Sequence, residues 1–232
     1  MMPATSPIPD GNGQTPAANG DEFGRVLRAS TTGFAVGSRV AQLEAPSFGC
    51  MVKAQPVDER EAIYGLIYDM NIDDDPLIRR LILAENPRQS VIEDQRRNRL
   101  VPIEMSVLTI GYRRDGDFYH GLPPRPPLNL DPVHLCTDSE EVIRFTDRAD
   151  YLRLILRTIG GSVPVDQLLV AHILQTYTMR GEDAAWARRM ISEIAVLLRG
   201  DYNLLTAILE TMSHSLPQLP EMAALSQPGS AR

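Results

Sequence analysis

The alternation of apolar and polar residues begins near Phe23 and predicts the first strands of the fold. Val26 stands among polar residues, and Phe34 and Val36 resume the alternation beyond Gly33. Alternation places one face of a strand against a core, and glycine tolerates the backbone conformation of a tight bend. We therefore predict two short strands joined by a turn.

Four further segments up to residue 136 have the composition of strands. They are residues 48–54, 62–68, 101–112 and 133–136. Gly65 lies within an Ile- and Tyr-rich run and indicates a bulge or a barrel corner. Residues 37–38 and 113–116 have the composition of turns. Several short strands separated by turns predict a small antiparallel β-barrel over residues 22–137.

Residues 73–100 interrupt this pattern with helical periodicity. Asp75 suits a helix N-cap, and Pro76 suits the first helical position. Apolar residues at helical spacing follow until Asn86-Pro87, and a second, very polar helix is expected over residues 88–100. We predict a helical insertion between two barrel strands.

The pattern becomes helical again from Asp138. A short helix is expected first, followed by four apolar stripes at helical spacing that end near Gly160-Gly161, Gly181, Gly200 and residue 212. Stripes of this kind mark amphipathic helices, and glycine commonly ends them. Four such stripes in succession predict a compact helical bundle over residues 138–214. Together with the barrel, this gives an α+β fold.

The two ends of the sequence are predicted to lie outside the folded core. Residues 1–21 are rich in Pro, Gly, Ala, Asn and Thr, which cannot bury enough apolar surface to offset chain entropy. We predict a disordered tail there and a flexible, Pro-rich tail over residues 215–232.

Composition narrows the classes of function. The chain has 232 residues, 43% hydrophobic and 23% charged, with a net charge of -7. Because phosphate contact relies on Lys and Arg, an acidic chain is not expected to be a general DNA binder. No apolar run is long enough for a membrane span, and no secretory signal is recognisable, so a cytoplasmic protein is expected. Cys50 and Cys136 are then expected to be free thiols rather than a disulfide.

Motifs that carry enzymatic chemistry are missing from the sequence. It contains no Gly-rich loop ending in Gly-Lys-Ser/Thr and no Gly-x-Ser-x-Gly elbow. Residues 69–73 begin like a calcium-binding loop, but Asp74 and Arg80 stand where that loop needs Gly and Glu. We therefore expect no catalytic activity and no bound cofactor.

A metal site at His120, His134 and Cys136 is the other chemical candidate. His134 and Cys136 lie two residues apart and would share one face of a strand. A zinc site usually needs four ligands at recognisable spacing, and only three candidates exist here. Core packing is the preferred interpretation of these side chains, and no metal is expected.

The densest basic cluster lies in the predicted insertion. It consists of Arg79, Arg80, Arg88, Arg96, Arg97 and Arg99. One interpretation is a patch for nucleic acid or for an acidic partner. The other is a solvated helix face, balanced by carboxylates at 73–75, Glu93 and Asp94. We favour the second, because the cluster lacks aromatic residues for base stacking.

Three segments resemble a known family. The start Phe23-Gly-Arg-Val26, the turn Ser30-Thr-Thr-Gly-Phe34 and the exit from Gly121-Leu-Pro-Pro to Val133-His-Leu-Cys136 are similar to the HAS-barrel. This small β-barrel is shared by HerA-type DNA-translocating ATPases and the α and β subunits of F-type ATP synthases. The resemblance covers about residues 22–137. It implies a barrel that assembles a ring and docks accessory subunits, such as the NurA-type nuclease.

The sequence departs from that family after the barrel. Where a HerA-type chain continues into a P-loop ATPase, residues 138–213 read as helices. The expected function is therefore a non-catalytic assembly or adaptor protein. Its barrel would form homo-oligomers or dock a protein partner such as a HerA-type ATPase or a NurA-type nuclease. The alternative is a nucleic-acid-binding module that uses barrel loops and the arginine-rich insertion.

Overall fold

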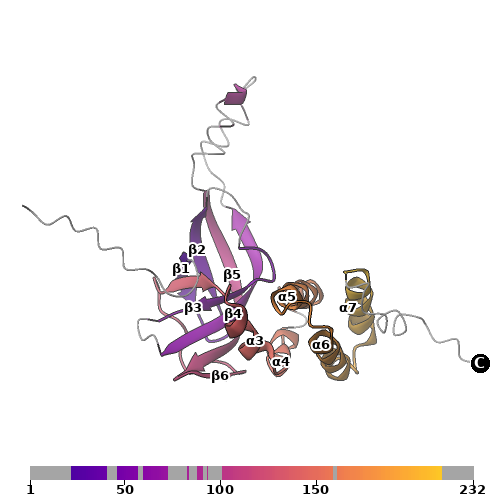
Figure 1. Ribbon diagram of the computed structural model, residues 1–232. Helices are drawn as coiled ribbons and strands as arrows, with labels where there is room; N and C mark the ends of the chain where they lie inside the picture. The colour runs from indigo at the N-terminus through magenta and orange to yellow at the C-terminus, as the bar shows by residue number, and fades with distance from the viewer. Residues whose placement is uncertain are drawn as a thin grey trace, which may run out of the picture.

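Seven strands come first in the described part of the chain, and five helices follow (Figure 1). The computed structural model describes residues 22–40, 46–56, 60–72, 83, 88–90, 93, 101–158 and 161–215. The predicted tails, apart from Ser215, and most of the predicted insertion lie outside these residues. The described part confirms an α+β fold.

Six strands close an antiparallel β-barrel. They are β1 (Glu22–Ala29), β2 (Gly33–Val40), β3 (Met51–Ala54), β4 (Glu61–Ile72), β5 (Val101–Arg114) and β7 (Pro132–Leu135). Their order is β2-β1-β7-β3-β4-β5, and pairing of β2 with β5 completes the ring. β6 (Asp117–Tyr119) pairs with the end of β5 through the turn that the sequence predicted after residue 113. The predicted barrel is confirmed.

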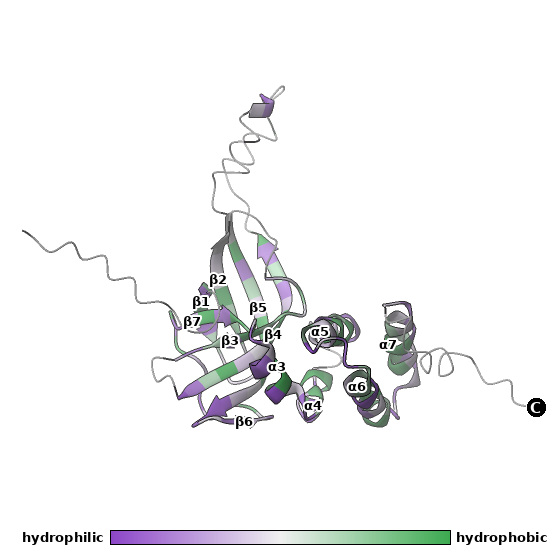
Figure 2. Ribbon diagram, in the orientation of Figure 1, coloured by the Kyte–Doolittle hydropathy of each residue, from purple (hydrophilic) through white to green (hydrophobic). Residues whose placement is uncertain are grey.

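The barrel interior is filled by alternate apolar residues of its strands. Val26, Phe34 and Val36 point inward, as the opening alternation predicted, together with Met105 and Val107 of β5. The hydropathy colouring shows this change of apolar and polar positions along the strands (Figure 2). Burial of one face of each strand sets the register, because a slip by one residue would expose that face.

Gly65 marks an irregularity in β4, as predicted. The pairing of β4 with β5 shifts register between Tyr64 and Gly65. A Cβ atom at Gly65 would lie 2.3 Å from Val107 Cγ1 and 2.8 Å from the Leu108 carbonyl oxygen. The missing side chain therefore lets β5 approach closely at the bulge.

The predicted turn at Gly37-Ser38 is wrong. Both residues lie inside β2, which continues to Val40. The Leu27 side chain covers Gly37, and the Ser38 hydroxyl donates to the Phe23 carbonyl. Gly37 thus leaves room for the Leu27 side chain, and Ser38 adds a hydrogen bond between β2 and β1. Local composition does not reveal either contact.

Five helices follow the barrel. They are α3 (Ser139–Thr146), α4 (Leu152–Leu156), α5 (Val165–Met179), α6 (Ala184–Leu197) and α7 (Tyr202–Ser215). The side chain of Asp138 caps α3 by accepting a hydrogen bond from the Glu140 amide, and that of Asp201 accepts one from the Leu204 amide at the start of α7. None of the described helices is long and apolar enough to cross a bilayer.

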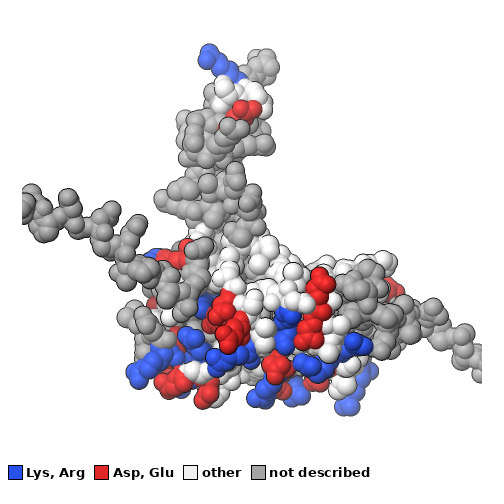
Figure 3. All heavy atoms as spheres, viewed as in Figure 1, with Lys and Arg blue, Asp and Glu red and all other residues white. Residues whose placement is uncertain are grey.

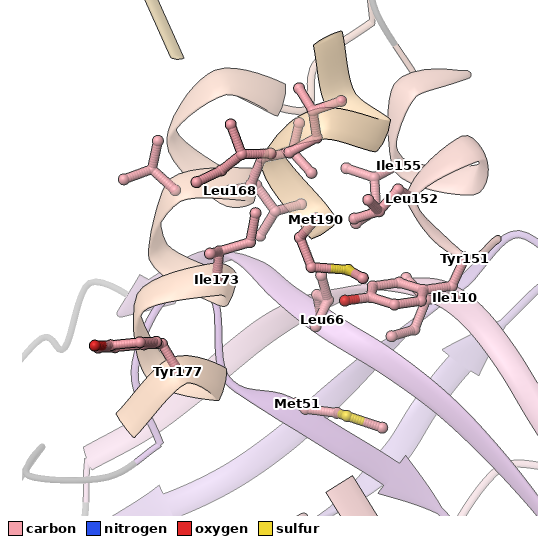
Figure 4. Packing of buried hydrophobic residues seen from close by; sticks show 14 of the residues in the cluster. Met51, Leu66, Ile110, Tyr151, Leu152, Ile155, Leu168, Ile173, Tyr177 and Met190 are labelled. Atoms are coloured by element: carbon pink, nitrogen blue, oxygen red, sulfur yellow. The ribbon is translucent and has the colours of Figure 1, made fainter. Parts of the chain in front are cut away.

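A second core joins these helices to the outside of the barrel. Leu66 and Ile110 project from β4 and β5 toward the helices, where Tyr151 and Met190 meet them (Figure 4). The barrel residues of this core belong to β3, β4 and β5. In the described structure the helices therefore cover one side of the barrel, and β1, β2 and β7 lie on the side away from them (Figure 2).

We predict that Gly65→Ala destabilises the protein by about 1–3 kcal/mol, because the new methyl group overpacks the β4–β5 contact. Urea denaturation followed by circular dichroism measures the loss. Gly200→Ala is the matched control, because nothing lies within 4 Å of the position of its Cβ atom. Equal stability of Gly65→Ala and the wild type would contradict the close approach at the bulge.

Candidate functional site

A buried carboxylate connects the barrel to the first helix. Glu141 follows the Asp138 cap of α3, where a negative charge suits the helix N-terminus. Its side chain points at the barrel wall. Lys53 Nζ of β3 donates to Oε2 at 2.6 Å, and Tyr64 Oη of β4 donates to Oε1 at 2.6 Å. Arg113 of β5 adds a third contact at 3.7 Å.

Burial makes these contacts strong and mutually dependent. The side chains of Lys53 and Glu141 are only 4% and 9% exposed. A charge removed from water is costly unless it is paired and hydrogen-bonded, as both are here. Burial and the neighbouring Glu141 carboxylate raise the pKa of Tyr64, so its hydroxyl stays a donor. These paired charges and hydrogen bonds therefore connect α3 to β3 and β4 of the barrel.

The space beside this cluster is too small for most ligands. A hollow of about 180 Å³ is lined by Lys53, Arg113, Glu141 and Arg144, among others. Small-molecule sites usually occupy roughly 300–1,000 Å³. The geometry therefore favours a structural role over an acid–base one.

One feature of the sequence indicates this cluster, although sequence analysis did not predict it. The acidic pair Glu140-Glu141 suits the first turn of α3, but this position alone does not indicate the pairing of Glu141. Lys53 is the only lysine of the chain, and it stands in an apolar strand. A lone lysine among apolar neighbours indicates a buried partner of opposite charge.

The other end of α3 is held by Arg180 and Trp186. Arg180 donates to the Ile143 carbonyl at 3.1 Å, and Trp186 Nε1 donates to the Thr146 carbonyl at 2.8 Å. The Arg180 guanidinium lies 5.1 Å from the centre of the Trp186 ring. These donors satisfy carbonyls at the C-terminal end of α3, which its own backbone leaves free.

The structure separates the histidines and the cysteine considered for a metal. His120 Nε2 lies 2.8 Å from the Phe145 carbonyl oxygen, whereas His134 lies on β7 opposite Lys53. Cys136 is a buried free thiol whose pKa is raised by burial, and Cys50 is free and half-buried. Within the described ranges, no three His, Cys, Asp or Glu side chains are grouped so that they could hold a metal.

Only Arg88 of the predicted basic cluster falls within the described residues, and it is exposed. Arg79, Arg80, Arg96, Arg97 and Arg99 lie outside them. Both interpretations of the cluster, a binding patch and a solvated helix face, therefore stay predictions.

Three exposed leucines lie on β1 and in the loop beside it. Leu27 of β1, Leu128 and Leu130 are 45%, 69% and 68% exposed. The Leu130 amide donates to the Val26 carbonyl at 2.8 Å, so the loop before β7 lies directly beside β1. We call these three residues the leucine ridge.

The backbone of the ridge is held in an unusual conformation. Leu130 has φ +71°, a left-handed conformation that costs a branched residue about 1–2 kcal/mol. The buried Asp131 carboxylate accepts from the Leu128 amide at 2.7 Å, and Arg25 donates to the Leu130 carbonyl at 3.0 Å. These bonds fix the loop and keep both leucines in solvent.

No protein-family model matches the chain, and no curated protein matches it in sequence.

We predict that Glu141→Ala lowers the free energy of unfolding by about 3–5 kcal/mol, because it leaves Lys53 charged, buried and unpaired. Urea denaturation measures the change. Glu140→Ala is the matched control at an exposed position of the same helical turn, where a change within about 0.5 kcal/mol is expected. The double variant Lys53→Met, Glu141→Leu should recover part of the loss. Equal effects of Glu141→Ala and Glu140→Ala would contradict a stabilising ion pair between Glu141 and Lys53.

We predict a second, pH-dependent loss of stability from His172. This fully buried side chain lies 3.1 Å from the Tyr151 hydroxyl, and burial lowers its pKa to about 4. In the unfolded chain the His172 imidazole protonates near pH 6.5. The free energy of unfolding therefore decreases as pH falls from about 6.5 to about 4, by roughly 3 kcal/mol in total.

Urea denaturation between pH 7 and pH 4 checks this expectation. His172→Gln should flatten the decline, whereas His214→Gln, at an exposed position on α7, is the matched control. An unchanged decline in His172→Gln would contradict a buried neutral imidazole.

Proposed function

We propose that this protein is a non-catalytic assembly or adaptor protein whose barrel binds a protein partner through the leucine ridge. The observation that carries the proposal is Leu130, an exposed branched residue held at φ +71°. Strain of this kind persists where the surrounding structure enforces it, and it is concentrated at functional positions. A leucine at this position weakens the free fold and offers an apolar contact to a partner.

The position of the ridge favours a protein surface as the ligand. Leu27, Leu128 and Leu130 stand on the part of the barrel that the described helices leave open. Apolar side chains at the centre of a contact, surrounded by polar groups such as Arg25 and Glu22, are typical of protein interfaces. Burial of the three leucines would contribute favourable free energy without any rearrangement of the barrel.

The resemblance to the HAS-barrel supplies the kind of partner. We propose that the barrel is of this type and that the ridge contacts a second copy of the chain, a HerA-type ATPase or a NurA-type nuclease. In this proposal the helical insertion over 73–100 and a helical bundle over 138–214 orient the bound partner. The closed barrel and the five described helices are compatible with it.

We predict that Leu130→Gly abolishes assembly while raising the stability of the isolated chain. Glycine removes the apolar side chain and also relieves the left-handed strain, by about 1 kcal/mol. Analytical ultracentrifugation of the purified chain, alone and mixed with a HerA-type ATPase or a NurA-type nuclease of the same genome, measures assembly. Urea denaturation measures stability.

Val196→Ser is the matched control, because Val196 is an exposed apolar residue of α6 away from the ridge. It should leave both assembly and stability unchanged. A chain that stays monomeric and binds neither protein, or an assembly that Leu130→Gly leaves intact, would overturn the proposed function.

A further inference from the structure

A second surface feature lies beside the hairpin that β5 and β6 form. A cavity of about 560 Å³ opens between this hairpin and the segment that contains α4. Its volume falls within the range of roughly 300–1,000 Å³ that is usual for small-molecule sites. The hairpin contributes aromatic side chains to its wall, and the α4 segment contributes arginines.

The aromatic wall is a stacked pair of tyrosines. The rings of Tyr112 and Tyr119 lie 5.0 Å apart with an angle of 12° between their planes. Tyr112 is held from the strand side, with the Arg114 guanidinium 5.8 Å from its ring centre. Tyr119 is 44% exposed and lies at the outer end of the stack. The exposed part of the Tyr119 ring is available to stack against a planar group.

The opposite wall carries positive charge. Arg148, Arg153 and Arg157 line the cavity together with one carboxylate, Asp150. Arg148 pairs with Asp150, and Arg153 lies 3.7 Å from Glu193 on α6. Arg157 is exposed, and no carboxylate of the described residues is within ion-pair distance of it. The arginines of this wall can therefore donate hydrogen bonds to an anionic group.

His120 adds an unused acceptor between the two walls. Its side chain is 7% exposed, and its Nε2–H donates to the Phe145 carbonyl at 2.8 Å. With Nε2 protonated, Nδ1 of the neutral ring is an acceptor, and it lies 4.0 Å from the Asp150 carboxylate, which cannot donate to it. Nδ1 is buried without a hydrogen-bond partner in the described structure.

We infer that this cavity binds a nucleotide, either free or as a unit of a single strand, with its base stacked on Tyr119 and its phosphate held by Arg157 and its neighbouring arginines. An aromatic platform next to a basic wall is the arrangement by which proteins hold unpaired nucleotides. The site differs from the arginine-rich insertion considered from the sequence, and it does not involve the leucine ridge. It is independent of the proposed assembly function.

Fluorescence anisotropy with a fluorescein-labelled 15-mer of deoxythymidine, and calorimetry with AMP, test the inference on the full chain. Tyr119→Leu should weaken binding by at least about fivefold, since stacking of one base is lost. Arg157→Ala should weaken it similarly and reduce the salt dependence of oligonucleotide binding by about 0.7 in the slope of log K against log salt.

Tyr202→Leu and Arg199→Ala are the matched controls, because both side chains are exposed and lie outside the cavity. They should bind like the wild type. Binding of the oligonucleotide but not of AMP identifies the ligand as a single strand, and tight binding of AMP identifies a free nucleotide. Absence of binding to both probes, or binding that Tyr119→Leu and Arg157→Ala leave unchanged, would overturn the inference.

Discussion

The ion pair between Glu141 and Lys53 determines how the helices meet the barrel. Neither charge could remain buried alone, so α3 must sit where its carboxylate reaches β3 and β4 together. Arg180 and Trp186 then fix the far end of α3, and through them α5 and α6 take their places. Directional contacts specify the orientation, whereas the apolar contacts around them supply most of the driving force.

Phe145 of α3 packs against aromatic residues that reach toward the surface. Its ring contacts Tyr64 at 4.8 Å, Phe118 at 5.7 Å and His120 at 4.9 Å between ring centres. The same aromatic cluster thus lies between the buried ion pair and the cavity beside the β5–β6 hairpin. Basic and acidic side chains alternate along the edge of the molecule near β6, α3 and α4, where no single sign of charge dominates (Figure 3). Local arrangement, and not net charge, therefore decides what this edge can bind.

The sequence allowed the barrel strands and the helix ends to be predicted, because alternation, capping carboxylates and glycines act over a few residues. It did not reveal that β5 is buried on both faces, since Leu108 and Ile110 face the helices while Met105 and Val107 fill the barrel. Nor could it pair Lys53 with Glu141, 88 positions away. The tyrosine stack and the arginines of the α4 segment were missed for the same reason, because only the fold brings them together.

The burial of Lys53 has a practical consequence for work with this protein. Apart from the chain terminus, the molecule carries a single primary amine, and that amine is 4% exposed within an ion pair. Reagents that acylate amines can reach it only when the barrel and α3 come apart. The rate of acylation at this one position therefore reports the opening of that junction under native conditions, without any engineered label.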